Sequence, residues 1–94
     1  MAKYRLSNIA KEDLERIYLY GLERYGAEQA ESYYMALFEK FEKIAENPEA
    51  YQGVDDIKQG YRRCLCGADS IYYRVNAGVV EIMAVLGRQN FTRL

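Results

Sequence analysis

The sequence contains no histidine, no tryptophan, one proline and two cysteines among its 94 residues. Without histidine, the chain lacks the usual proton carrier near neutral pH, so catalytic triads of the serine or cysteine type have no ordinary base. Cys64 and Cys66 lie two apart on one expected strand, where disulfide geometry is poor, and a metal site would need further soft or imidazole ligands. We therefore expect no metal and no cofactor, and binding in preference to catalysis.

Long hydrophobic runs are also missing. No stretch approaches the ~20 apolar residues of a membrane-spanning helix, and residues 1–5 have no hydrophobic core of the kind found in signal peptides. We therefore expect a cytoplasmic protein with no membrane partner. The length fits a single domain, 1–94, near the size at which burial is a modest fraction of the unfolded surface. We expect its stability to depend partly on a partner.

The net charge of −1 hides an uneven distribution. Residues 1–50 hold 7 Lys and Arg against 10 Asp and Glu, whereas residues 51–94 hold 6 against 4. From Gln59 onward every cation is an arginine, whose planar fork of donors suits carboxylates and phosphates. The second half should therefore face an anionic partner. The alternative is that these arginines are ordinary solvated residues of strands.

The first half predicts a strand followed by two helices. Residues 3–6 have strand character, and Ser7 or Asn8 can cap the helix that follows. Gly26 is a suitable residue to end this helix, and a second helix should run over residues 27–46, before the chain's one proline. Each helix has an apolar stripe, so the two can form an antiparallel hairpin that covers one face of a sheet. The stripes are Ala10, Leu14, Ile17, Tyr18, Gly21 and Tyr25, then Ala30, Tyr33, Tyr34, Leu37, Phe41 and Ile44.

Three strand-like runs separated by glycine turns follow after residue 60, and residues 48–59, which show no periodicity, are expected to be a loop. Tyr72 and Tyr73 must point to opposite faces of a strand, so at most one should lie fully in the core. The third run is apolar on both faces, which is typical of a central strand. Its alternation places four residues on one face, namely Val80, Ile82, Ala84 and Leu86.

These elements predict an α+β fold. An N-terminal strand precedes an antiparallel helical hairpin, and a three-stranded antiparallel meander completes one small sheet. Several short motifs accompany this order of elements. They are Tyr4-Arg5-Leu6-Ser7, Ala10 with Asp13-Leu14 and Ile17, Gly26 with Ala30 and Tyr33, Gly60-Tyr61-Arg62-Arg63, Ile71-Tyr72-Tyr73-Arg74-Val75 and Val85-Leu86-Gly87-Arg88-Gln89. In this order they resemble the ParE branch of the RelE/ParE toxin superfamily, over essentially the whole chain.

This resemblance implies the toxin of a bacterial type II toxin–antitoxin pair, which a ParD-like antitoxin neutralises by direct binding in a hetero-oligomer. ParE-type toxins inhibit DNA gyrase and so block replication, which implies gyrase as the partner, through its A subunit, without sequence-specific binding of nucleic acid. RelE-type relatives instead cleave messenger RNA on the ribosome. Phe91 stands near the C-terminus, where that branch tends to have an ionisable ring, so the sequence favours the ParE branch.

Two alternatives remain beside gyrase inhibition: a ribosome-dependent mRNA endoribonuclease, and a family member that only binds its antitoxin and helps to regulate transcription. For contact with the target we assign four residues by their chemistry and position, Arg63, Arg74, Arg88 and Arg93. The antitoxin should lay a helix in an apolar groove formed by the hairpin and the adjoining sheet face, with its acids meeting arginines. For this contact we assign Leu14, Tyr18, Arg62 and Tyr72.

Overall fold

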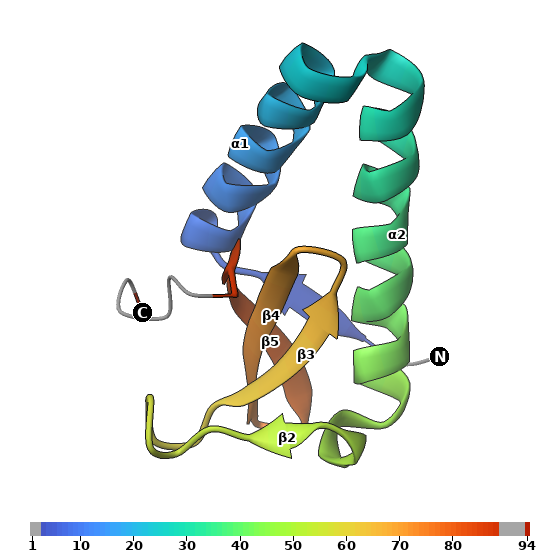
Figure 1. Ribbon diagram of the computed structural model, residues 1–94. Coiled ribbons are helices and arrows are strands. Elements are labelled where there is room, and N and C mark those ends of the chain that lie inside the picture. The colour runs from blue at the N-terminus through green and yellow to red at the C-terminus, as the bar shows by residue number, and fades with distance from the viewer. Residues whose placement is uncertain (1–2, 89–93) are drawn as a thin grey trace.

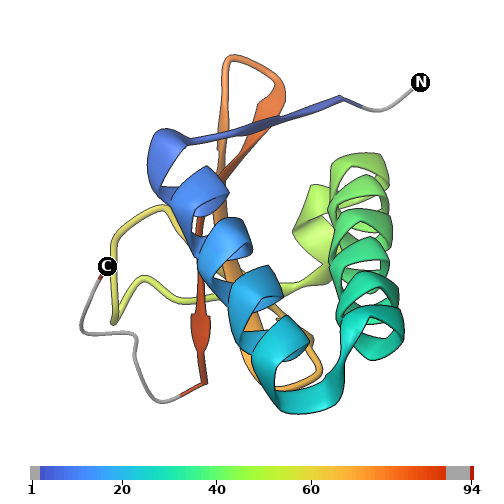
Figure 2. The ribbon, with the colours of Figure 1, turned by 90° about the horizontal axis from the view of Figure 1, so that it is seen from above.

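The computed structural model describes residues 3–88 and residue 94. Two helices form a hairpin that packs against a five-stranded sheet (Figure 1), and the view from above shows α1 and α2 side by side, with strands of the sheet passing behind α1 (Figure 2). The elements are β1 (Tyr4–Leu6), α1 (Asn8–Tyr25), α2 (Ala27–Glu46), the 3-10 helix η1 (Pro48–Ala50), β2 (Gln52–Gly53), β3 (Arg62–Cys66), β4 (Asp69–Asn76) and β5 (Val79–Gly87). The predicted α+β class and the order of the hairpin and meander are confirmed.

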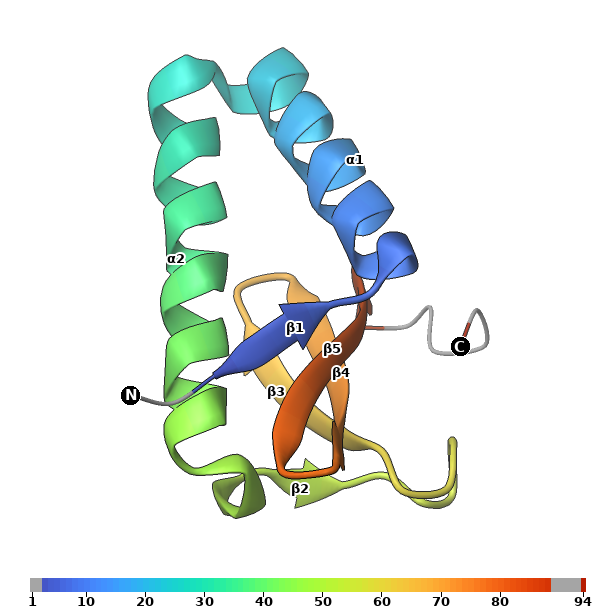
Figure 3. The same ribbon diagram turned by 180° about the vertical axis from the view of Figure 1, so that it is seen from behind.

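The sheet has the strand order β1-β5-β4-β3-β2. β1 runs parallel to β5, as the view from behind shows (Figure 3), and the other neighbouring strands are antiparallel. The prediction of a loop over residues 48–59 is wrong at its start, because η1 and β2 occupy most of residues 48–53. A strand of two residues is too short for alternation to appear in the sequence.

The helices begin and end close to their predicted limits. Ser7 is the cap of α1, since its Oγ accepts a hydrogen bond from the backbone N–H of Ala10 at 3.0 Å. Gly26 separates the helices with a φ of 90°, a conformation that residues with a Cβ rarely adopt. Beside it the helices touch, because a Cβ at Gly21 would lie 3.2 Å from the Cβ of Ala30. Neither helix combines the length and apolar composition needed to cross a membrane.

The main core lies between the hairpin and the sheet. An aromatic row crosses it from α1 to β1, with ring centroids 5.3 Å apart for Tyr18 and Tyr34, and 5.5 Å apart for Phe41 and Tyr4. Burying one aliphatic or aromatic side chain of this size stabilises the fold by about 1.5–3 kcal/mol. The buried residues are Ala10, Leu14, Ile17, Leu37, Phe41 and Ile44 of the helices and Cys64, Cys66, Ile71, Tyr73, Val80, Ile82 and Val85 of the strands.

A second, smaller core covers the other face of the sheet. Tyr72 and Tyr73 are both fully buried, one in each core. The prediction that at most one of them is fully buried is therefore wrong. The reason is that the segment before β3 folds over the second face and brings apolar side chains onto it. The second core consists of Val54, Tyr61, Tyr72, Ala84 and Leu86.

A bulge in β5 changes which face its side chains occupy. Tyr72 pairs with Ala84 and Tyr73 with Ile82, so Met83 stands opposite no residue of β4. Ahead of the bulge the even-numbered residues face the main core, and beyond it they face the second core. The predicted common face is therefore wrong for Val80, Ile82, Ala84 and Leu86.

Side chains of the first turns of α1 bind the edge of β5 beyond its pairing with β1. Ser7 donates from its Oγ to the carbonyl oxygen of Met83 at 3.0 Å. The Asp13 carboxylate accepts from the N–H of Val85 at 3.0 Å, and Arg16 donates to the carbonyl oxygen of the same residue at 3.1 Å. Asp13 is buried for this reason, although it is charged. These bonds fix α1 against the sheet and so position the surfaces on both sides of the hairpin.

Candidate functional site

Four charged side chains gather on the sheet face turned away from the helices. We call Arg5, Arg63, Arg74 and Glu81 the arginine face. The register of the strands makes them neighbours. Arg5 and Arg74 both pair with Glu81. Arg63 pairs with Tyr72, which lies two residues before Arg74 on the same face of β4. The Glu81 carboxylate accepts from Arg5 Nη2 at 2.6 Å and from Arg74 Nε at 2.7 Å. Residues far apart in the sequence thus form one charged surface.

Glu81 fixes the orientation of two guanidinium groups without hiding them. The hydrogen bonds from Arg74 and Arg5 lower the pKa of Glu81, and the same contact raises the pKa of Arg74, so the groups stay ionised. The side chains of Arg5 and Arg74 remain 61% and 44% exposed. Arg63 donates to the side chain of Gln52 at 3.3 Å, its one side-chain hydrogen bond among the described residues. Three cations against one acid leave a positive excess that suits an anionic partner.

Two other predicted arginines, Arg62 and Arg88, lie apart from this face. Arg62 lies on the opposite side of β3, where it donates to the carbonyl oxygen of Tyr51 at 2.7 Å and is half-buried. Arg88 follows the end of β5 and donates to the carbonyl oxygen of Gly67 at 2.7 Å. Seven positions separate it from Glu81, a span of roughly 23 Å along a strand. Arg93 lies outside the described residues. Of the three predicted target contacts that the structure describes, Arg63 and Arg74 lie on one face and Arg88 does not.

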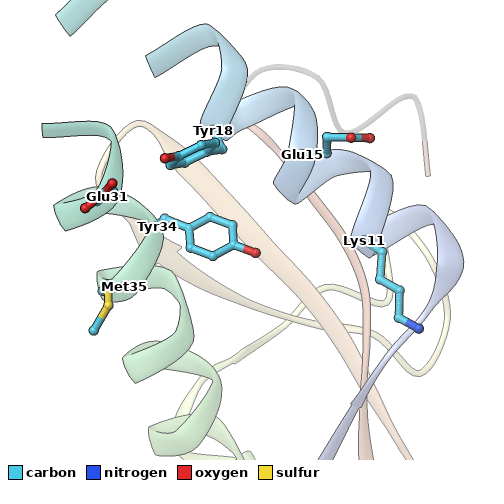
Figure 4. Close-up of a pocket in the computed structure, with 6 residues that line it drawn as sticks. All are labelled: Lys11, Glu15, Tyr18, Glu31, Tyr34 and Met35. Carbon is cyan, nitrogen blue, oxygen red and sulfur yellow. The ribbon is translucent and has the colours of Figure 1, made fainter. Parts of the chain in front are cut away.

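A groove runs along the outer side of the hairpin, between α1 and α2 (Figure 4). We call it the interhelical groove; its volume is about 560 Å³. Tyr18 and Tyr34 form its floor with an edge-to-face contact, and Met35 on its wall is 63% exposed. Charged side chains stand at its rim, so it combines an apolar floor with polar borders. Its lining residues are Lys11, Glu15, Tyr18, Glu31, Tyr34 and Met35.

Among the residues assigned to the antitoxin, only Tyr18 lies in this groove. Leu14 is 3% exposed and belongs to the main core, and Tyr72 is fully buried in the second core. Neither side chain is available to a partner in this structure, because the core around it covers it. Arg62 lies on β3, away from the lining of the interhelical groove. The structure therefore does not bring these four residues together.

Arg5 and Met35 are the residues that the sequence analysis missed. Arg5 joins the arginine face only through the parallel pairing of β1 with β5, a long-range contact with no local signal. Met35 stands outside the apolar stripe of α2, and its place among polar residues is the signal that the sequence offered. Single exposed apolar side chains are common on protein surfaces, so this signal does not by itself mark a contact surface.

The two cysteines do not form part of either surface. Cys64 and Cys66 are free thiols buried in the main core, and burial raises the pKa of both. They therefore pack as small apolar side chains. Across the residues that the structure describes, no group of three or more Cys, Asp or Glu side chains is placed to hold a metal ion.

Comparison with known proteins gives consistent matches over nearly the whole chain. Residues 4–90 match the family described as the ParE toxin of the type II toxin–antitoxin system parDE. Toxin ParE1 of Caulobacter vibrioides is 44% identical over 86 residues, which cover 92% of this chain and 88% of the relative. Toxin ParE1 of Mycobacterium tuberculosis is 34% identical over 86 residues, which cover 90% of this chain and 88% of the relative.

The fold is also similar to a solved structure, described as the chromosomal ParDE toxin–antitoxin system from P. aeruginosa. The TM-score is 0.81, and the match covers 93% of this chain and 96% of the other. Sequence identity is 19%, so this likeness concerns the fold alone.

Proposed function

Because this chain belongs to the ParE family of type II toxins, we propose that it inhibits DNA gyrase in the bacterial cytoplasm and so blocks replication. A ParD-like antitoxin neutralises it by direct binding, and the toxin acts by binding and not by catalysis. The observation that carries the proposal is the arginine face, an exposed and oriented positive surface on a histidine-free chain. The A subunit of gyrase is the expected contact.

The arginine face supports binding to an anionic target for a physical reason. A planar guanidinium forms paired hydrogen bonds with a carboxylate or a phosphate, and Glu81 already holds two such groups in place. Preorganisation of this kind lowers the entropy lost on binding. Acidic side chains of gyrase, or phosphates of the DNA that it holds, have the complementary charge.

A supercoiling and cleavage assay with purified gyrase, plasmid DNA and ATP tests this function. We expect the native chain to accumulate linear DNA, and the triple variant Arg5→Ala, Arg63→Ala, Arg74→Ala to lose that activity. Arg24→Ala is the matched control, because Arg24 is an exposed arginine on the hairpin. Full activity of the folded triple variant would contradict the role of the arginine face. Unchanged supercoiling together with cleaved transcripts in a translation reaction would favour the ribosome-dependent endoribonuclease.

The interhelical groove is the proposed seat of an antitoxin helix. An amphipathic helix can place its apolar side on Tyr18, Tyr34 and Met35, while its polar side meets the charged rim. We expect Met35→Glu to raise the Kd for the neighbouring antitoxin by about tenfold or more, because it introduces a charge into an apolar contact. Leu65→Glu is the control, since Leu65 is 48% exposed on the opposite face of the sheet. Equal affinities of both variants would contradict this seat.

A further inference from the structure

A second hollow lies beneath the tip of the hairpin, on the side that faces the sheet. We call it the tip hollow; its volume is about 580 Å³, within the range of small-ligand sites. The last turns of α1, the first turns of α2 and the turn between β3 and β4 enclose it, and Figure 1 shows that turn below the joined ends of the helices. It is lined by Arg16, Ile17, Tyr20, Gly21, Tyr25, Gln29, Ala30, Tyr33, Ala68, Asp69 and Gly87.

Among the residues that the structure describes, the tip hollow contains one carboxylate, that of Asp69, without an ion pair. Arg16 also lines the hollow, but it lies 3.4 Å from the buried carboxylate of Asp13 and donates to the backbone of Val85. Within residues 3–88, no lysine or arginine nitrogen lies within 4.0 Å of Asp69. Asp69 is therefore the acid of this lining that makes no ion pair among these residues, and Arg88, which follows Gly87, donates instead to the carbonyl oxygen of Gly67.

Tyr33 orients this carboxylate. Its hydroxyl lies 2.7 Å from Asp69 Oδ2 and 2.8 Å from the carbonyl oxygen of Cys66. Burial, followed by the hydrogen bond to Asp69, raises the pKa of Tyr33, so the hydroxyl stays protonated and acts as the donor. In the part of the chain that the structure describes, no hydrogen bond reaches Asp69 Oδ1. That oxygen is available to a donor that enters the hollow.

Three tyrosine rings complete the lining. Tyr20 and Tyr25 are 52% and 60% exposed, and Tyr33 stands beside Asp69. The face of an aromatic ring carries partial negative charge and attracts cations. Tyr20 already illustrates this attraction, because the guanidinium carbon of Arg24 lies 5.5 Å from the centre of its ring. Aromatic faces and a carboxylate both attract cations, and the tip hollow is lined by both.

We propose that the tip hollow receives an arginine side chain of the neutralising antitoxin, with the guanidinium hydrogen-bonded to Asp69 and stacked on the tyrosine rings. Arginine fits better than lysine, because a planar guanidinium can stack on a ring and donate in its own plane to a carboxylate, whereas an ammonium group is a compact, strongly hydrated charge. The inference rests on the proposed function only in naming the antitoxin as the source of the arginine.

A first experiment needs no antitoxin. The labelled full chain is titrated with N-acetyl-arginine methylamide, N-acetyl-lysine methylamide and N-acetyl-glutamine methylamide, and amide shifts are followed by NMR. We expect saturable shifts of Tyr20, Tyr25 and Asp69 with the arginine compound, at least about tenfold weaker binding of the other two, and loss of the shifts in Asp69→Asn. Asparagine can still accept from Tyr33, so the local hydrogen bond is retained. Equal binding of the lysine compound, or unchanged binding to Asp69→Asn, would overturn the proposal.

A second experiment measures antitoxin affinity and gyrase inhibition in the same variants. We expect Asp69→Asn to raise the Kd for the antitoxin by about tenfold while inhibition of gyrase stays unchanged. Asp56→Asn, which removes an exposed acid from the loop before β3, should change neither quantity. Native antitoxin affinity of Asp69→Asn would overturn the proposal. Failure of the native chain to inhibit gyrase would instead refute the proposed function and leave the NMR result standing.

Discussion

Gly67 allows the turn between β3 and β4 to lie directly against Tyr33. Its φ is 56°, and a Cβ at this position would lie 2.6 Å from a ring carbon of Tyr33. We expect Gly67→Ala to lose about 1–2 kcal/mol for the left-handed backbone, and more because the ring must move. Gly78→Ala is the control, with a φ of 78° and no atom within 4 Å of the added Cβ. Urea denaturation should show a larger loss for Gly67→Ala; equal losses would contradict the role of Tyr33.

Tyr73 makes the stability of the chain sensitive to alkaline pH. Burial raises the pKa of Tyr73 from 10.0 to about 12, and its hydroxyl donates to the carbonyl oxygen of Pro48. The fold favours the protonated phenol, so this stabilisation is complete below pH 10.0 and is lost as the pH rises through about 12. We expect the free energy of unfolding to fall over that window, and to fall less steeply in Tyr73→Phe. Identical pH profiles would exclude Tyr73 as a cause.

At the scale of elements, α1 and β5 should gain much of their stability from each other. Asp13→Ala removes the carboxylate that accepts from the Val85 N–H and from Arg16. Both donors then lose this acceptor. We expect a loss of about 1–3 kcal/mol, because a buried donor is left unsatisfied. Glu12→Ala, one position earlier on an exposed site, should change stability by much less. Equal unfolding midpoints for the two variants would show that the Asp13 contact contributes little.

The helices were predictable because their signals are local. Ser7 at the start, Gly26 at the turn and an apolar stripe in each helix all lie within a few residues of the boundary or face that they define. The bulge at Met83 has no comparable signal, since it depends on the register between β4 and β5. Alternation along one strand therefore gave correct faces up to Ile82 and wrong ones beyond it. Local patterns predict elements, but they do not predict pairing.

The same limit explains the outcome for the surfaces. Of the four arginines chosen by chemistry and position, the structure places Arg63 and Arg74 on one face, and Arg5 was missed because β1 reaches β5 across most of the chain. Leu14 and Tyr72 have the apolar character expected of contact residues, and the sequence could not distinguish that role from core packing. Both residues are buried because a core covers each face of the sheet, and this covering depends on tertiary packing.

At the scale of the whole molecule, the arginine face and the interhelical groove lie on different layers, one on the far face of the sheet and the other on the outer side of the hairpin. We therefore expect their effects to separate. Met35→Glu should still poison gyrase but escape neutralisation, and the triple arginine variant should be inactive yet bind antitoxin with nearly native affinity, since distant sites act independently. Growth assays with and without antitoxin, beside measured affinities, test both. Joint loss of the two activities in either variant would show that the surfaces overlap.

The contact between α1 and β5 also affects how the chain behaves beside other copies of itself. Free N–H and C=O groups along an outer strand are a template on which another chain can pair and aggregate. Ser7, Asp13 and Arg16 occupy such groups at Met83 and Val85, so α1 substitutes there for a sixth strand. Self-association along this strand would require the helix to detach first, which makes the docking of α1 a safeguard of solubility as well as a source of stability.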